Sequence, residues 1–318
     1  MATGAVPSSD ALFWPPLREG DRVRLVSPAS WPEGDGLRLT KETLEGWGLT
    51  VDVGAHATDR YGYMAGRDAD RLADLNDAFR DPTVRAIVAT RGGAGAYRIS
   101  DQLDFAAARR DPKPVLGFSD ITDLHLALWR ECRLVCFHGC VIGSDAARSA
   151  RALLMGTNRN TVVSDPSALS AGVRVSGVAS GPLVGGNFST IAHRVGAGLP
   201  DLRGAILLIE DTRGIGIGRV DRQLTQLRRA GALAGLAGVA LGLISGFDDY
   251  VDRGWTVLDV LRDHLCELGV PVHGGLPIGH GGALDADGFP DQVCVALGAD
   301  AVLDADAGTL TMGGNPRV

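Results

Sequence analysis

The chain has 318 residues, of which 45% are hydrophobic and 22% are charged, and its formal net charge at pH 7 is −7. These values are ordinary for a globular protein, and the length suits two domains or one large one. The acidic balance and the scattered basic residues argue against nucleic-acid binding as the main role. No apolar run approaches the ~18 to 20 residues that span a bilayer, so no membrane segment is expected.

The first half of the chain alternates strand-like and helix-like segments. After a loose arm at residues 1–19, the hydrophobic spacing predicts strands at 21–28, 50–53 and 85–90 and helices at 37–47 and 68–79. Such alternation predicts an α/β fold with a doubly wound parallel sheet. Because such sheets bind ligands at the carboxyl ends of their strands, we expect functional residues in the loops that follow them.

The most informative stretch lies at residues 113–125. An apolar run ends in Gly-Phe-Ser-Asp at 117–120 and passes directly into helical spacing, which predicts a strand, a tight turn carrying Ser119, and a helix. Nucleophilic serines occupy turns of this kind, although Ile121 replaces the final glycine of the Gly-x-Ser-x-Gly pattern. The alternative, that Ser119 or Asp120 merely caps the helix, is favoured when this stretch is taken alone.

A glycine-rich loop follows the strand predicted at 85–90 and contains Arg91, Gly92 and Gly93. Glycines let backbone N–H groups face an anion, but the loop lacks the Lys-Ser/Thr ending of a phosphate-binding P-loop. A plain turn between strand and helix is the simplest interpretation. If the loop lies beside Ser119, it supplies one N–H of an oxyanion hole, and Asp120 supplies the second.

The chain changes character between residues 143 and 172, which are polar and rich in turn residues. We therefore expect an N-terminal domain over 1–150, a linker region over 151–172 and a C-terminal domain over 173–318. The hydrophobic pattern of the C-terminal part predicts a mixed sheet with few helices. Its predicted strands are 173–177, 204–209, 238–244, 292–296 and 301–312, and its predicted helices are 220–233 and 257–268.

A nucleophilic serine needs a base, and the base needs an orienting partner. Of the seven histidines, His138 and His280 follow strands in glycine-flanked loops, where functional residues concentrate. A turn residue with an unusual backbone angle explains His280 equally well. Glu210 ends a buried strand, where an ionisable group must be solvated, paired or catalytic, and pairing with a nearby arginine is the simpler account.

Cofactor chemistry is not indicated by the sequence. The five cysteines form no convincing zinc pattern, and no histidine and carboxylate cluster has ligand spacing, so we expect buried free thiols, no metal and no cofactor. Residues 1–20 lack the basic segment and apolar core of a signal peptide, which predicts a cytoplasmic location.

Taken together, these segments resemble the LD-carboxypeptidase family of serine peptidases, which also contains the microcin C immunity proteins. The resemblance runs from about residue 23 to residue 312. It rests on Arg-Gly-Gly at 91–93, Gly-Phe-Ser-Asp-Ile-Thr at 117–122, Gly-Gly-Asn at 185–187, Glu-Asp at 210–211, Asp-Arg at 221–222 and Pro-Ile-Gly-His at 277–280. Their order and spacing make the match specific.

The resemblance implies a role for each of the candidate residues. It makes Ser119 the nucleophile, His280 the general base and Glu210 the group that orients it, with a flavodoxin-like N-terminal domain carrying the serine and a C-terminal domain carrying the other two. The implied oxyanion hole uses the backbone N–H of Gly92 or Gly93 and that of Asp120. A homodimer is also implied.

The resemblance implies a substrate class as well. The family's archetypal substrate is a murein tetrapeptide from cell-wall recycling, whose L,D-amide is hydrolysed to release the terminal D-alanine. Arg91 and Asn187 are expected to contact substrate, although structural roles explain both residues equally well. The alternatives are a related serine amidase acting on a peptide-like antibiotic or other metabolite, and a binding protein that keeps the fold without turnover.

Three departures from the family pattern leave the substrate open. Ala94 stands where the family often has tyrosine, and Cys140 follows the His-Gly pair where proline is usual. Residues 212–218 lack the acidic residue and tyrosine common at this place.

Overall fold

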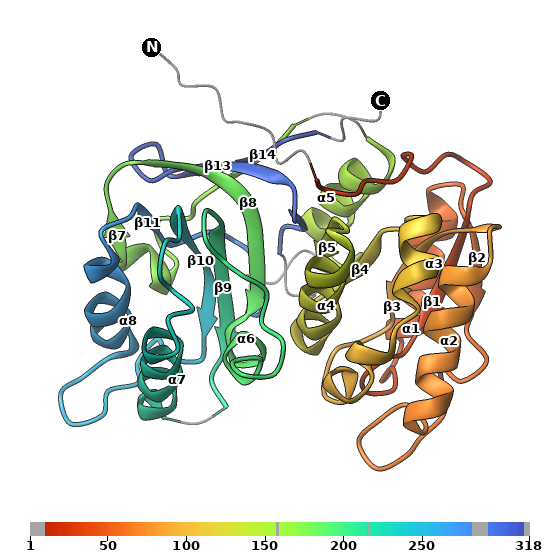
Figure 1. The fold of residues 1–318 in the computed structure, drawn as a ribbon, viewed down its shortest axis with the longest axis horizontal. Coiled ribbons are helices and arrows are strands. Elements are labelled where there is room, and N and C mark those ends of the chain that lie inside the picture. The colour runs from red at the N-terminus through yellow and green to blue at the C-terminus, as the bar shows by residue number, and fades with distance from the viewer. Residues whose placement is uncertain (1–9, 157–158, 215, 282–291, 315–318) are drawn as a thin grey trace.

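Two β-sheets, each flanked by helices, make up the protein (Figure 1). The computed structural model describes residues 10–156, 159–214, 216–281 and 292–314. Within these ranges, no helix has both the length and the apolar character needed to cross a membrane.

The first sheet has the strand order β12-β5-β4-β3-β1-β2. Five of its strands run parallel, and the sixth, β12, pairs antiparallel with β5. Apart from β12, the order is that of flavodoxin-like folds, as predicted. The strands are β1 (Arg22–Val26), β2 (Thr50–Val53), β3 (Val84–Ala89), β4 (Val115–Gly117), β5 (Cys136–His138) and β12 (Val295–Leu297).

The helices of the first half are α1 (Gly36–Gly46), α2 (Asp68–Arg80), α3 (Phe105–Arg110), α4 (Thr122–Cys132) and α5 (Ser144–Met155), with short 3₁₀ turns η1 (Ala96–Arg98), η2 (Ser100–Gln102) and η3 (Ser119–Ile121). Helix α4 is buried on nearly all sides because it lies between the two sheets, where it contacts β5 on one side and β8 on the other (Figure 1). The helix that follows Ser119 is therefore part of the junction between the two halves.

Helix α5 lies in the segment for which the sequence indicated only turns. Three of its four buried residues are small, namely Ala146, Ser149 and Ala150, and the helix packs against β12. Small side chains allow close packing but give a weak hydrophobic pattern, which hid the helix. Within the predicted linker region, β6 (Asn160–Val163) forms an edge of the second sheet, and η4 (Leu169–Gly172) follows it.

The second sheet is mixed, as predicted, and has the order β6-β14-β13-β8-β9-β10-β11-β7. Strands β8 to β11 run parallel, and the outer pairs are antiparallel. Its further elements are β7 (Arg174–Val175), β8 (Val178–Asn187), α6 (Phe188–His193), β9 (Ile206–Thr212), α7 (Ile217–Arg229), β10 (Gly238–Ser245), α8 (Val257–Leu265), η5 (Cys266–Leu268), β11 (Val272–His273), β13 (Asp300–Asp304) and β14 (Thr309–Met312).

The two halves are joined by polar contacts as well as by packing. Arg194 forms a 2.8 Å ion pair with Asp123 of α4, and both side chains are only 4% exposed. The backbone N–H of Asn187, at the end of β8, donates to Thr122 Oγ1 at 3.0 Å. Strand β12, from the C-terminal part of the chain, completes the first sheet. The domain boundaries at 150 and 173 stay predictions.

Candidate active site

Ser119 lies on the turn between β4 and α4, at the carboxyl end of a parallel strand. Its φ angle is +64°, in the left-handed region that residues with a Cβ atom rarely adopt. Such strain is typical of nucleophile turns, because it lifts the side chain away from the sheet. The Ser119 side chain caps no helix, since neither η3 nor α4 has a side-chain cap hydrogen bond. The geometry therefore favours the nucleophile interpretation over the helix-cap interpretation.

The glycine-rich loop lies directly against this turn. A Cβ atom on Gly92 would come within 2.7 Å of Ser119 Cβ and 2.9 Å of the Phe118 carbonyl oxygen, so only glycine fits there. Gly93 has a φ of +103°, and a side chain on it would collide with Ser30. The loop backbone can therefore approach the reacting atoms as closely as an oxyanion hole requires.

Four hydrogen bonds, made with Ser30, Arg71 and Asp120, hold the loop in place. Ser30 donates its backbone N–H to the Gly92 carbonyl and accepts the Ala94 N–H on its hydroxyl, at 3.1 and 3.2 Å. The Arg71 guanidinium donates to the Gly95 carbonyl at 2.9 Å. The Asp120 carboxylate accepts the Ala96 N–H at 2.8 Å, and burial raises the pKa of Asp120 to about 6. The loop and the serine turn are thus fixed relative to each other.

Glu210 and His280 come together from two strands of the second sheet. Glu210 is completely buried on β9, and His280 follows β11. His280 Nδ1 donates to Glu210 Oε2 at 2.7 Å, and the His280 backbone N–H donates to the same oxygen at 3.0 Å. These two bonds fix both the ring and the backbone of His280. The geometry therefore does not favour the simpler interpretations, in which Glu210 pairs with an arginine and His280 is a plain turn residue.

The pKa values of this pair shift in opposite directions. Burial alone would raise the pKa of Glu210, but the imidazoles of His138 and His280 hold that pKa well below its usual range. Burial alone would lower the pKa of His280, but the Glu210 carboxylate outweighs it and raises that pKa. Glu210 is therefore ionised at neutral pH and stabilises a positive charge on His280.

His138 is a further member of this cluster, to which the sequence gave no role. It is fully buried at the end of β5, and its Nε2 lies 3.6 Å from Glu210 Oε1. Its position after a strand and before Gly139 was the signal in the sequence. His125 lies behind it, with ring centroids 6.4 Å apart, and burial lowers the pKa of His125 to about 3, which keeps it neutral.

Two cavities meet at Ser119. The larger, of about 610 Å³, is also lined by Asp120 and Asn187, whereas the smaller, of about 440 Å³, is also lined by Arg91 and His280. Ser119 and His280 thus face the same space, and the ring of Phe118 lies 5.0 Å from that of His280. Among the described residues, no hydrogen bond joins Ser119 to His280.

Arg91 and Asn187 line cavities but already have protein partners. Arg91 lines the smaller cavity and pairs with Glu33 at 2.5 Å. The Asn187 side chain caps α6 by accepting the Thr190 N–H and donates to Asp211 at 3.0 Å, beside the larger cavity. Both residues have the structural roles that the sequence left open, and their contact with substrate stays a prediction.

Two of the three departures from the family pattern lie at the cavities. Ala94 lines the larger cavity. Cys140 lines the smaller one, where Gln292 Nε2 donates to its sulfur at 3.3 Å. Thr212 and Gly214 line a separate cavity of about 80 Å³ instead, and residue 215 lies outside the described residues. All five cysteines are free thiols.

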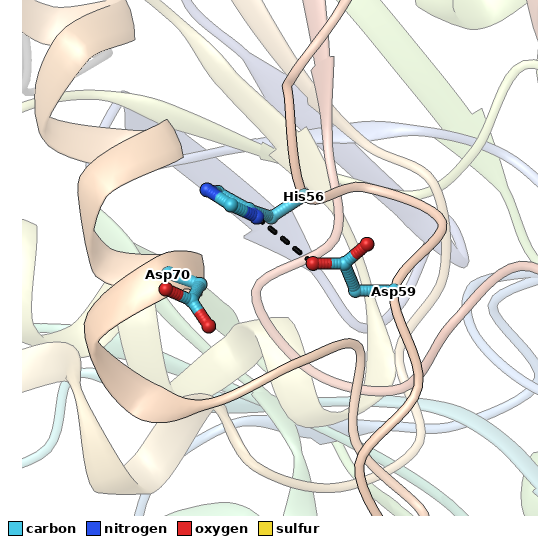
Figure 2. Close-up of side chains that lie close together, drawn as sticks. All are labelled: His56, Asp59 and Asp70. Atoms are coloured by element: carbon cyan, nitrogen blue, oxygen red, sulfur yellow. Dashed lines mark hydrogen bonds and ion pairs between the residues drawn. The ribbon is translucent and has the colours of Figure 1, made fainter.

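One cluster of side chains has the spacing of a metal site, and it lies away from Ser119. His56, Asp59 and Asp70 bring their ligand atoms within 4.8 Å of one another (Figure 2). His56 Nδ1 is hydrogen-bonded to Asp59 at 2.8 Å, and Asp59 is exposed. Exposed acidic groups of this kind are common without an ion, and none of the three residues lines either cavity at Ser119. The sequence gave no indication of the cluster.

Comparison with known proteins agrees with the fold and the motifs. Residues 23–139 match the model of the LD-carboxypeptidase N-terminal domain, and residues 180–301 match that of the C-terminal domain. The murein tetrapeptide carboxypeptidase of Pseudomonas aeruginosa is 32% identical over 294 residues, which cover 86% of this chain and 92% of that protein.

Solved structures of similar proteins share the fold over nearly the whole chain. The muramoyltetrapeptide carboxypeptidase of Oxalobacter formigenes superposes with a TM-score of 0.77 at 27% identity, covering 93% of this chain and 99% of that one. A MccF-like protein of Bacillus anthracis reaches a TM-score of 0.83 at 22% identity, covering 96% and 100%. With both domain models matched in order and relatives aligned over almost their full length, this chain belongs to the LD-carboxypeptidase family and is an α/β carboxypeptidase.

Proposed function

We propose that this protein is a serine carboxypeptidase that hydrolyses the L,D-amide bond of murein tetrapeptides and releases their terminal D-alanine. The observation that supports the proposal most is the hydrogen bond from His280 Nδ1 to the buried Glu210, next to a cavity that Ser119 also lines. The named activities of the relatives from Pseudomonas aeruginosa and Oxalobacter formigenes support the substrate.

In this mechanism, Ser119 Oγ attacks the amide carbonyl while His280 Nε2 takes its proton. Glu210 holds the ring through Nδ1, which leaves Nε2 available, and its charge stabilises the imidazolium that forms. The backbone N–H of Gly92 or Gly93 and that of Asp120 bind the oxyanion, and each donor lowers the barrier by roughly 2.7–4 kcal/mol. His280 then protonates the departing amine, and water releases the acyl group from Ser119.

The alternative substrate, a peptide-like antibiotic or other metabolite, stays a prediction. Structures of MccF, the microcin C7 self-immunity protein, are 21–23% identical to this chain and therefore support the fold alone. The changes at Ala94 and Cys140 lie in the two cavity walls, where they bear on substrate choice. A homodimer and a cytoplasmic location also stay predictions of the family resemblance.

The experiment that tests the proposal follows D-alanine release from a purified murein tetrapeptide. The wild-type protein should release D-alanine and should leave a peptide ending in an L,L bond intact. Ser119→Ala should lose nearly all kcat, whereas Ser167→Ala, which removes an exposed turn hydroxyl outside both cavities, should keep it. Equal rates for Ser119→Ala and wild type would refute the assignment of the nucleophile.

A further inference from the structure

Glu210 holds His280 with only one of its two carboxylate oxygens. Oε2 accepts both hydrogen bonds from His280, one from the ring Nδ1 and one from the backbone N–H. Oε1 is buried and accepts no hydrogen bond from the described residues. A buried carboxylate oxygen without a donor is rare, because the loss of its bonds to water is costly. The group that faces Oε1 therefore has a part in holding Glu210.

His138 is the group that faces this oxygen. Its Nε2 lies 3.6 Å from Glu210 Oε1, and both side chains are completely buried. Nε2 has no other hydrogen-bond partner among the described residues. A water that bridged the two atoms would need roughly 5 Å between them, because each of its two bonds spans about 2.8 Å. The imidazole and the carboxylate therefore face each other directly, slightly beyond hydrogen-bond distance.

The surroundings of His138 restrict its ring. The rings of Phe118 and His125 lie against it edge to face, with centroids at 6.2 and 6.4 Å. Strand β8 passes close by at Gly186, where a Cβ atom would come within 2.9 Å of His138 Nδ1. Gly186 also has a φ of +128°, which favours glycine. The ring is therefore held near the orientation in which Nε2 faces Glu210.

His138 belongs to the half of the protein that carries Ser119. Strand β5 lies beside β4, and their register pairs His138 with Gly117, two positions before Ser119. The N–H of Gly139 donates to the Gly117 carbonyl at 3.1 Å, so the ends of the two strands are fixed together. Glu210 lies on β9 of the second sheet. The contact therefore joins the sheet of the nucleophile to the carboxylate that orients the base.

The charge of Glu210 decides which ring nitrogen of His138 has the proton. In a neutral imidazole one nitrogen donates and the other accepts. A proton on Nε2 offers a donor to Glu210 Oε1, whereas a bare Nε2 would turn its lone pair toward an ionised carboxylate. The Nε2–H form is therefore favoured. His125, on the other side of the ring, adds no charge, because burial lowers its pKa to about 3.

We propose that His138 is a positioning residue whose Nε2–H binds Glu210 Oε1 and so fixes the carboxylate, and with it His280, relative to the sheet that carries Ser119. The inference rests on the proposed function, in which Glu210 orients the base. Hydrogen bonds of active sites commonly shorten when substrate binds, so the 3.6 Å contact closes in the reacting complex. His138 lines neither cavity and takes no part in the chemical steps.

Two substitutions of similar length separate the donor from the shape of the side chain. His138→Gln keeps an N–H near the position of Nε2, whereas His138→Met fills the space without a donor. His138→Met should lower kcat for D-alanine release about tenfold or more, because a hydrogen bond to a charged group is lost. His138→Gln should keep most of the wild-type kcat, and KM should change little in both. Wild-type kcat in a folded His138→Met protein, or equal losses in the two variants, would overturn the inference.

His273→Met is the matched control, because His273 is a buried histidine that lines neither cavity. It should keep the wild-type kcat. A double variant then tests whether His138 acts through Glu210. Adding His138→Met to Glu210→Gln should lower kcat little further, because the carboxylate is already gone. A further loss as large as in the wild-type background would show a packing role and would overturn the inference.

A spectroscopic measurement tests the contact without turnover and without a core substitution. Nitrogen NMR on wild-type protein with isotope-labelled histidine shows which ring nitrogen of His138 is protonated. We expect the proton on Nε2, and a bare Nε2 would overturn the inference whatever the activity of the variants. A protonated Nε2 in a wild-type protein that releases no D-alanine would count against the proposed reaction and not against the contact with Glu210.

Discussion

Replacing Glu210 with glutamine removes the charge behind His280 while keeping the shape of the side chain. Glu210 Oε2 lies 2.7 Å from His280 Nδ1 and is completely buried. At an effective dielectric constant of about 20, a carboxylate and an imidazolium at this distance attract each other by ~6 kcal/mol. Replacing the triad aspartate of a serine protease with asparagine lowers kcat by ~10⁴. This loss corresponds to about 5.4 kcal/mol of activation free energy. The two estimates agree, so we expect Glu210→Gln to lower kcat by about 10⁴.

The assay is steady-state D-alanine release, with circular dichroism and a thermal melt to show that the variant is folded. Asp211→Asn is the matched control, because the neighbouring Asp211 bonds to Asn187 and Ser189 rather than to His280. Its rate should stay within about tenfold of wild type. A folded Glu210→Gln protein that also stays within tenfold would refute the argument that the carboxylate stabilises the imidazolium.

Three further predictions follow from the same geometry. The pKa of His280 is raised, and the base must be neutral to accept a proton, so the acidic limb of the pH profile of kcat/KM should lie above the ordinary histidine pKa. In Glu210→Gln this limb should move to lower pH. A limb that does not move would contradict the coupling between Glu210 and His280. Gly92→Ala should cost about 1–3 kcal/mol of stability and lower kcat, because the added Cβ atom meets Ser119. Urea unfolding measures the stability and D-alanine release measures kcat. Wild-type values for both would contradict the close approach of Gly92 to Ser119. Arg194→Met should destabilise the fold by about 3–5 kcal/mol, because Asp123 is left buried and unpaired; an unchanged urea midpoint would contradict this.

The sequence predicts the first sheet well because its strands and helices alternate regularly. Strands β1 to β4 fall where the hydrophobic pattern indicates, and β5 ends at His138, the histidine expected at the end of a strand. The order of these five strands is that of the flavodoxin-like fold. Strand β12 could not be predicted to join this sheet, since its three residues pair with a strand more than 150 positions away. Helix α5 was hidden by its small side chains, which bury little area each.

The candidate site could be predicted only in part. The local pattern around Ser119 indicated a nucleophile turn, and its positive φ supports that interpretation. The contact between Glu210 and His280 spans 70 residues, so no periodicity or spacing could reveal it, and the family resemblance supplied the pairing. The Asp123 and Arg194 ion pair was missed for the same reason, because its two charges come from different halves of the chain.

The central claim is that Ser119, from the first half, and His280, from the second, act as one catalytic unit. The most direct measurement is kcat for D-alanine release by Ser119→Ala, by His280→Ala and by the double variant. Residues that act as a unit lose about as much singly as together. We therefore expect the double variant to be no slower than the slower single variant. Losses that multiply in the double variant would show that the two residues act independently and would contradict the account.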